Sequence, residues 1–260
     1  MTTNRWTKDQ LKLAFYLYCQ MPFGKMHRSN PEVVELAGLI GRTPSAVAMK
    51  LVNFASLDPA ITATGRSGLD NTSALDREIW NDFHADWEGL AIECSALRGK
   101  LLSPAGKPKP AELDADELVG LDDFSGETRR VATEQRIKQH FFRRAVLSIY
   151  RGRCCMSGVS DPRLLQASHI VPWSMDKANR LNPSNGLCLS VLHDRAFDRG
   201  MIGVTAELTI VVSDRLKSST DEFVQRTLGT LNGRTIELPE RFLPSKEFLA
   251  RHMNEVFENS

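Results

Sequence analysis

Three polar residues between positions 154 and 203 have the types and spacing that phosphodiester chemistry needs. His169 lies in the apolar run Ala-Ser-His-Ile-Val, Asn185 begins an Asn-Gly pair, and His193 follows within Leu-Ser-Val-Leu-His-Asp-Arg-Ala-Phe. The apolar neighbours of His169 predict a partly buried strand that holds its imidazole still. The Asn-Gly pair predicts a sharp turn, and the pattern around His193 predicts a short helix.

Hydrolysis of a phosphodiester requires a base that deprotonates water and positive charge that stabilises the transition state. A neutral histidine is a suitable base near pH 7, and a divalent cation with nitrogen and oxygen ligands supplies the charge. We therefore predict that His169 is the general base and that His193 is a metal ligand. The Asn185 amide is expected to hydrogen-bond across the loop and to position the backbone of His169.

Other interpretations of these residues are plainer. A single histidine is most often a core or surface residue, and Asn-Pro-Ser-Asn-Gly by itself is a turn. A serine hydrolase that uses Ser168 and His169 is disfavoured, because neighbours on a strand point to opposite faces. The combination of a histidine, an Asn-Gly turn and a second histidine at this spacing favours a nuclease.

This order of residues resembles the HNH endonucleases, and His169, Asn185 and His193 correspond to the three letters of that name. The resemblance covers about fifty residues. It implies a ββα-metal site with one divalent cation, which is Mg²⁺, Mn²⁺, Ni²⁺ or Zn²⁺, and products that carry 5′ phosphates. Many members brace the fold with paired C-x-x-C zinc knuckles, which this chain lacks, so no structural zinc is expected.

Two positions depart from the pattern of that family. Many members carry Asp or His just before the base, where this chain has Ser168, and a hydroxyl is expected to act only through a bound water. A further ligand often follows one helical turn after the last histidine, where this chain has Phe197. Asp198 is the next residue and can reach the metal if the helix ends there. Ser168, His193 and Asp198 are thus the candidate metal ligands.

Length and composition are those of an ordinary globular protein. The chain has 260 residues, of which 42% are hydrophobic, enough for two modest domains. We find no apolar run of about eighteen residues and no signal-peptide pattern. The five cysteines are an odd number without a disulfide framework, which suits a reducing compartment, so we expect a cytoplasmic protein.

Charge is strongly segregated, although the formal net charge is only +1. Segment 111–127 holds seven acidic residues and no basic one, and it is either a solvated linker or a phosphate mimic that occupies the basic surface. Segment 129–153 is basic, with one acid, Glu134. Its cations are expected to contact DNA phosphates, unless they only form a soluble face. The basic residues are Arg129, Arg130, Arg136, Lys138, Arg143, Arg144, Arg151 and Arg153.

Three short helices with N-terminal caps are predicted at the start of the chain, from Thr7 to Gln20, from Pro31 to Gly41 and from Pro44 to about Phe54. They resemble a helix-turn-helix unit. In that interpretation the third helix enters the major groove, with Ser45, Met49 and Asn53 near bases and Arg42 and Lys50 near phosphates. The alternative is a helical bundle that packs on the nuclease or on a partner.

The remaining patterns complete the expected architecture. One long helix is predicted from Asn71 or Ser73 to about Lys100, a proline-rich boundary at 103–110, and a helix from Thr133 to about Tyr150. A hairpin of 201–204 with 208–212 and a helix from Ser245 to Phe257 follow. The predicted fold class is α+β, with an all-helical domain at 1–102, an acidic linker at 103–128 and a ββα-metal HNH nuclease domain at 129–260.

These features predict a metal-dependent DNA endonuclease that resembles bacterial restriction enzymes, including those that act on modified DNA. We expect a homodimer, because cutting both strands needs two sites. One alternative is a DNA-binding module whose HNH fold has lost its metal, as Ser168 and Phe197 suggest. Another is a nuclease effector gated by a partner or small molecule at the N-terminal helices.

Overall fold

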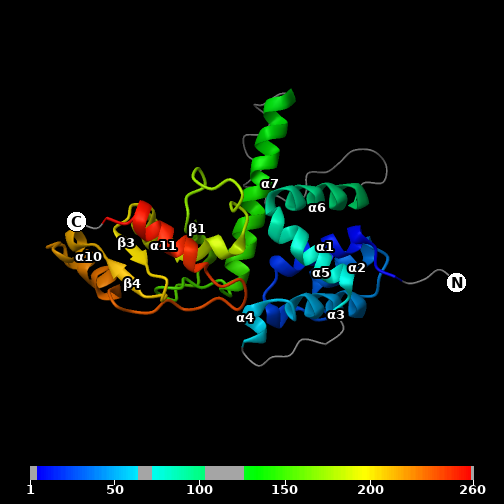
Figure 1. Cartoon of the computed structure of the whole chain (residues 1–260), viewed down its shortest axis with the longest axis horizontal. Coiled ribbons are helices and arrows are strands. Elements are labelled where there is room, and N and C mark those ends of the chain that lie inside the picture. The colour runs from blue at the N-terminus through cyan, green and yellow to red at the C-terminus, as the bar shows by residue number, and fades with distance from the viewer. Residues whose placement is uncertain (1–4, 64–71, 103–125, 259–260) are drawn as a thin grey trace. The chain divides into compact units, whose positions relative to one another are not determined.

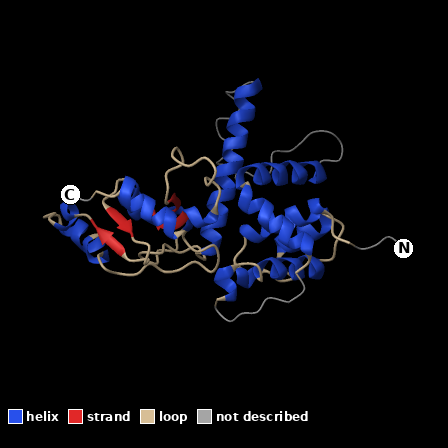
Figure 2. Ribbon diagram, viewed as in Figure 1, coloured by secondary structure: helices blue, strands red, loops and turns tan. Residues whose placement is uncertain are grey.

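The computed structural model describes residues 5–63, 72–102 and 126–258. The chain divides into two compact units, Met1–Ala145 and Val146–Ser260, and the division falls inside helix α7 (Gly126–Ile149). All described elements of the first unit are helices, whereas the strands lie in the second (Figure 2). The proline-rich segment 103–110 and residues 111–125 of the acidic segment lie outside the described residues.

The three N-terminal helices are confirmed, and their caps explain where each one begins. Thr7 forms a capping box with Gln10, Asn30 accepts a hydrogen bond from the backbone N–H of Glu32, and Thr43 caps the third helix. Each capping side chain satisfies a backbone donor that the first turn leaves unpaired. The helices are α1 (Lys8–Cys19), α2 (Pro31–Leu39) and α3 (Pro44–Ala55), followed by the short α4 (Pro59–Thr62) (Figure 1).

The prediction of one long helix up to about Lys100 is wrong, because the structure has two helices in this range. These are α5 (Ala74–Ala85) and α6 (Trp87–Leu102), separated at Asp86. Asp86 leaves the helical conformation, with φ −148° and ψ 79°. Its Oδ1 accepts a hydrogen bond of 2.8 Å from the backbone N–H of Gly89, so the side chain caps the second helix. Helix α7 also begins earlier than predicted, at Gly126 instead of Thr133.

Aromatic side chains form the core of the first unit around Phe15 on α1. The Phe15 ring lies 4.6 Å from Phe83, 5.0 Å from Phe54 and 5.4 Å from Trp80, measured between ring centroids. Trp87 is 1% exposed. Trp87 therefore stabilises the helical unit by burial, and the half-buried Trp80 packs against Phe15.

The expected exposure of Lys50 and Asn53 on α3 is wrong, since these residues are only 8% and 7% exposed. Lys50 Nζ lies 2.9 Å and 3.0 Å from the two carboxylate oxygens of Asp76 on α5, which is fully buried. A buried carboxylate requires a counter-charge, and the aliphatic stem of lysine can pack in the core to provide it. Of the five proposed DNA-reading residues, Ser45 and Met49 are exposed.

Arg42, the remaining residue of that set, is half-buried and engaged within the unit. Its Nη2 donates to Gln10 Oε1 at 3.0 Å, and its guanidinium lies 5.0 Å from the centre of the Trp6 ring. Both contacts hold the side chain on its own unit.

The second unit contains two small antiparallel sheets and several helices (Figure 1). The first sheet pairs β1 (Leu165–His169) with β2 (Gly186–Ser190), and α8 (Val191–Asp198) follows directly. The second pairs β3 (Ile202–Val204) with β4 (Ile210–Val212), which confirms the predicted hairpin. The later helices are α9 (Asp214–Lys217), α10 (Glu222–Thr227) and the predicted C-terminal helix, α11 (Lys246–Glu255).

The cysteines form no disulfide bonds, and the described helices are not of the membrane-spanning kind. All five cysteines are buried free thiols, and Cys188 is in the core. Among the described helices, none combines the length and apolarity that crossing a membrane requires.

We predict that Lys50→Met lowers the free energy of unfolding of the first unit by about 3 to 5 kcal/mol, because it leaves the Asp76 carboxylate buried without its cation. The matched control is Lys8→Met, since Lys8 pairs with Glu78 on the same helix but the two side chains are 56% and 45% exposed. Urea denaturation followed by circular dichroism measures both. Equal shifts of the midpoint in the two variants would contradict the importance of the buried pair.

Candidate active site

The β1–β2 hairpin fixes the direction in which the candidate residues point. His169 is paired with Gly186 and Ser168 with Leu187, so the two neighbours occupy opposite faces of the sheet. Ser168 is 2% exposed, whereas His169 is half-buried. Because α8 follows β2 without a loop, its first turn is held next to the hairpin. The order of strand, strand and helix brings the predicted site residues into one small region.

His169 is held by a backbone carbonyl of the loop between the two strands. Its Nε2 lies 2.9 Å from the carbonyl oxygen of Arg180. A carbonyl can only accept, so the neutral ring carries its proton on Nε2 and its basic lone pair on Nδ1. Burial lowers the pKa of His169 to about 4, opposed by the hydrogen bond to Arg180 and assisted by that residue's charge. The imidazole is therefore neutral at pH 7 and able to accept a proton.

Asn185 ties together the two ends of the same loop. Its Oδ1 accepts a hydrogen bond of 2.8 Å from the backbone N–H of Val171, and its Nδ2 donates to the Val171 and Asn179 carbonyls at 3.2 Å each. The side chain is completely buried. The sequence predicted an amide that bonds across the loop, and the structure places those bonds at Val171, two residues beyond His169.

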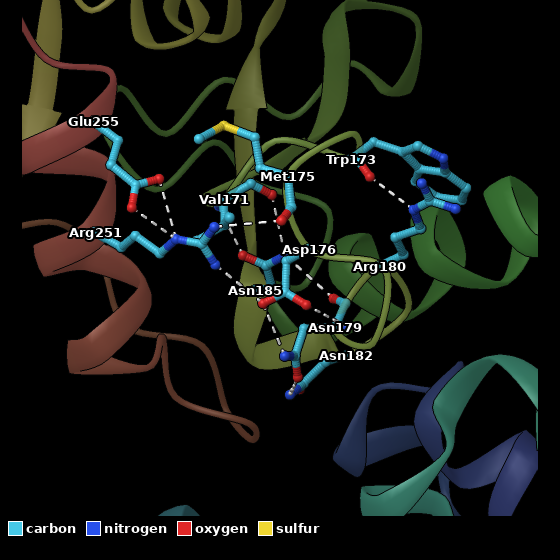
Figure 3. A network of polar contacts seen from close by, with 10 residues as sticks. All are labelled: Val171, Trp173, Met175, Asp176, Asn179, Arg180, Asn182, Asn185, Arg251 and Glu255. Carbon is cyan, nitrogen blue, oxygen red and sulfur yellow. Dashed lines mark hydrogen bonds and ion pairs between the residues drawn. The ribbon is translucent and has the colours of Figure 1, made fainter.

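Further polar residues brace the loop that carries the Arg180 carbonyl (Figure 3). The Arg180 guanidinium donates to the Trp173 carbonyl at 2.7 Å and lies over the Trp173 ring. Asn179 Nδ2 donates to Asp176 Oδ2 at 3.0 Å, and Arg251 of α11 reaches that carboxylate at 3.3 Å. The sequence analysis missed these supports. The contact of Arg251 joins positions 75 residues apart, and no local pattern signals it.

Two carboxylates share one face of α8, and the sequence analysis identified only the second. Asp194 and Asp198 are one helical turn apart. Burial raises the pKa of the Asp194 carboxyl, while Ser168 and Arg195 act to lower it. Partial burial and then the charge of Asp194 raise the pKa of Asp198, although it lies at the exposed end of the helix. The structure therefore places Ser168 next to Asp194, which lies one helical turn from Asp198.

The hydroxyl of Ser168 lies near Asp194 but forms no hydrogen bond of normal length. Its Oγ is buried and has no partner at normal hydrogen-bond distance, although it is close enough to Asp194 to lower that pKa. A buried polar atom without a partner is costly unless a water or an ion completes it. Oxygen donors of this kind suit a hard divalent cation. The described residues nevertheless contain no group of three or more His, Cys, Asp or Glu side chains that could hold a metal.

His193 lies on the adjoining face of α8 and is 4% exposed. Its Nδ1 lies 2.9 Å from Ser190 Oγ and 3.4 Å from Cys154 Sγ. Burial raises the pKa of the Cys154 thiol, but hydrogen bonds from His193, Ser157 and the backbone outweigh burial and lower it to about 6. Since Nδ1 is engaged, only Nε2 of His193 can serve as the predicted metal ligand.

The four arginines predicted to bind phosphates differ in their surroundings. Arg144 pairs with Glu32 at 2.6 Å within the first unit, so its charge is partly neutralised, and Arg143 is half-buried. Arg151 and Arg153 are exposed at the beginning of the second unit. Arg151 lies 3.9 Å from Glu240, which is a weak contact for an exposed side chain.

One comparison with known proteins identifies the segment that contains this site. The sequence model of the HNH endonuclease family matches residues 154–205, which include β1, β2, α8 and β3. His169, Asn185 and His193 lie inside the match, as do the Asp194 and Asp198 carboxylates. No curated protein matches the chain.

We predict that Asn185→Ala lowers the free energy of unfolding of the second unit by about 2 to 4 kcal/mol, because it leaves buried backbone groups of Val171 without partners. The amide proton of Val171 should also exchange much faster with solvent. Asn182→Ala is the matched control, because Asn182 lies in the same loop but is half-buried, and its side chain bonds to Ser184 and Asn179 and not to Val171. Unchanged exchange at Val171 in the Asn185 variant would contradict the proposed clamp.

Proposed function

Because residues 154–205 form an HNH endonuclease domain, we propose that this protein is a metal-dependent DNA endonuclease. The observation that supports this most strongly is the state of His169. The Arg180 carbonyl leaves its basic atom on Nδ1, and its lowered pKa keeps the ring neutral at pH 7. A general base must present an unprotonated nitrogen to the water it activates, and the bond to Arg180 places that nitrogen at Nδ1.

In the proposed reaction His169 Nδ1 takes a proton from a water molecule while the water oxygen bonds to phosphorus. The bond between phosphorus and the 3′ oxygen breaks, so the products carry a 5′ phosphate and a 3′ hydroxyl. The 3′ oxygen takes up a proton as it leaves. Asn185 fixes the loop during this step through its bonds to Val171 and Asn179, which keeps the Arg180 carbonyl against the imidazole.

HNH domains generally use a divalent metal, and the oxygen atoms around α8 suit one. We propose that Asp194 and Asp198 hold the cation, with Ser168 acting through a water molecule. His193 Nε2 is the proposed nitrogen ligand and would join them on metal binding, since the three side chains are not grouped around one point in the described structure. A bound cation would supply positive charge to the phosphate and the leaving oxygen. It would also relieve the repulsion that raises the pKa of Asp198. Mg²⁺ and Mn²⁺ are favoured over softer metals, because carboxylates and water are their usual ligands.

The domains predicted from the sequence suggest a division of roles in the proposed enzyme. We propose that residues 1–102 recognise DNA or a partner and that residues 129–260 cut the strand, with 103–128 as the linker. Arg143, Arg151 and Arg153 would contact phosphates, which gives affinity without sequence information. On α3 only Ser45 and Met49 remain available to read bases.

We further propose a biological setting for this activity. A helical unit joined to an HNH domain suits a bacterial restriction or defence nuclease, including one that acts on modified DNA. A cytoplasmic homodimer would place two sites on the two strands of a duplex. These assignments rest on the resemblance described above.

A second candidate is a DNA-binding module with an inactive HNH fold. The observation that favours it is Phe197, which occupies the position one turn after His193. Phe197 is completely buried, and its ring stacks on His252 with a centroid distance of 3.7 Å. It belongs to the core of the unit, so that position offers no metal ligand.

Plasmid cleavage in the presence of Mg²⁺, Mn²⁺, Ni²⁺ or EDTA tests the proposed function on plain and cytosine-modified DNA. His169→Ala should reduce kcat by a factor of about 10² to 10⁴, the usual contribution of a general base. Asp194→Asn with Asp198→Asn should raise the metal concentration needed for half-maximal cutting.

Two controls match these substitutions. His27→Ala removes an exposed histidine of the first unit, and Asp214→Asn removes an exposed acid of the second. Both should cut at the wild-type rate. If the wild-type protein binds DNA but cuts neither substrate with any metal, this result would support the inactive DNA-binding module and overturn the proposed endonuclease activity.

A further inference from the structure

A cavity lies on the second unit beside His193, and no other residue of its wall takes part in the proposed reaction. Its volume is about 360 Å³. The cavity is formed by the start of α8, by the segment around Ser157, and by α10 with the turn that follows it. His193 is part of its wall, so the cavity borders the candidate site directly.

The charge of the cavity wall has one sign. Arg226 and Arg234 line it, and no Asp or Glu does. Both arginines are exposed, and neither forms an ion pair with any residue that the structure describes. Two guanidinium groups that share a concave surface without a carboxylate suit an anionic ligand, since their field attracts negative charge into the cavity.

Arg226 is presented by a helix that is firmly held despite its short length. Asp221 caps α10 by accepting from the backbone N–H groups of Phe223 and Val224. Gln225, next to Arg226, donates its side-chain amide to the carbonyls of Leu216, Lys217 and Ser219 at 2.9 to 3.0 Å. The base of the Arg226 side chain is therefore fixed.

Arg234 is presented by a segment that runs along β4. Its carbonyl accepts from the Ile210 N–H at 2.8 Å, and the N–H of Gly233 donates to the Ile210 carbonyl at 2.8 Å. Asn232 Oδ1 accepts from the Val212 N–H at 3.0 Å. Gly233 adopts φ +79°, which a glycine reaches without strain and which turns the chain into this pairing. Arg234 thus also projects from ordered backbone.

The two threonine hydroxyls of the cavity wall are engaged within their own segment. Thr227 Oγ1 donates to the Phe223 carbonyl at 2.6 Å, and Thr230 Oγ1 donates to the Arg226 carbonyl at 3.0 Å. Their protons are engaged in the helix, so they cannot also donate to a ligand. A guanidinium group presents several donors in a planar fork that matches two oxygens of a phosphate. The favoured ligand is therefore a phosphate group.

We propose that this cavity binds a backbone phosphate of the nucleic acid substrate, adjacent to the phosphate that is cut, through Arg226 and Arg234. The proposal rests on the proposed nuclease function and adds a substrate-positioning site to it. The arginines would hold the strand in register while His169 acts on the neighbouring bond.

The test is the salt dependence of DNA binding, measured by fluorescence anisotropy with a labelled 20-base-pair duplex in EDTA. All proteins carry His169→Ala, so that binding is observed without cutting. Arg226→Gln with Arg234→Gln should reduce the slope of log Kd against log salt concentration by about 1, because the loss of one phosphate contact removes about 0.9 from it. Arg226→Lys with Arg234→Lys should restore most of the slope and verifies folding.

The control is Arg215→Gln with Lys246→Gln, which removes the same charge from exposed positions elsewhere in the unit. A control that loses as much slope as the cavity variant would overturn the site and leave only general electrostatic attraction. An unchanged slope in a folded cavity variant would also overturn it.

Parallel plasmid cleavage by the protein with His169 intact separates this proposal from the proposed function. Normal cutting, together with an unchanged salt slope in the cavity variant, refutes only the proposed phosphate site. DNA binding that depends on the cavity arginines, without any cutting, refutes only the proposed endonuclease activity. A protein that neither binds nor cuts refutes both proposals.

Discussion

The bond between the His169 imidazole and the Arg180 carbonyl is the interaction on which the proposed chemistry depends. It sets the tautomer and the orientation of the ring, while burial keeps the ring neutral at pH 7. The bond forms only if the loop between β1 and β2 keeps one shape. Asn185 enforces that shape from inside, and Arg251 supports it from α11. The site thus depends on a rigid loop between β1 and β2, and most of its polar residues stabilise that loop.

The sequence was sufficient to predict the elements whose signals are local. Caps such as Thr7 and Asn30 define helix starts, and the strands around His169 follow from their apolar pattern. The break at Asp86 escaped prediction, because an aspartate within an apolar helical pattern gives only a weak capping signal. Lys50 was expected to be exposed, because its counter-ion Asp76 lies on another helix and contacts of that kind depend on tertiary packing.

The candidate site was predictable to a similar extent. The spacing of the two histidines and the Asn-Gly turn identified the hairpin and the helix that carry it. Asp194 was overlooked, because its nearness to Ser168 arises only when α8 folds back on β1. The structure also shows that adjacent positions on this short helix have different roles. His193 contacts Ser190 and Cys154, whereas Asp194, the next residue, lies near the Ser168 hydroxyl.

The most direct test of this account is the state of His169 in solution, measured by two-bond proton–nitrogen correlation spectra of the ¹⁵N-labelled protein as a function of pH. The account predicts a neutral ring at pH 7 with its proton on Nε2, and protonation only as the pH approaches 4. The resonances can be assigned by their loss in His169→Ala. A proton on Nδ1, or titration near the ordinary histidine pKa of about 6.5, would contradict the account.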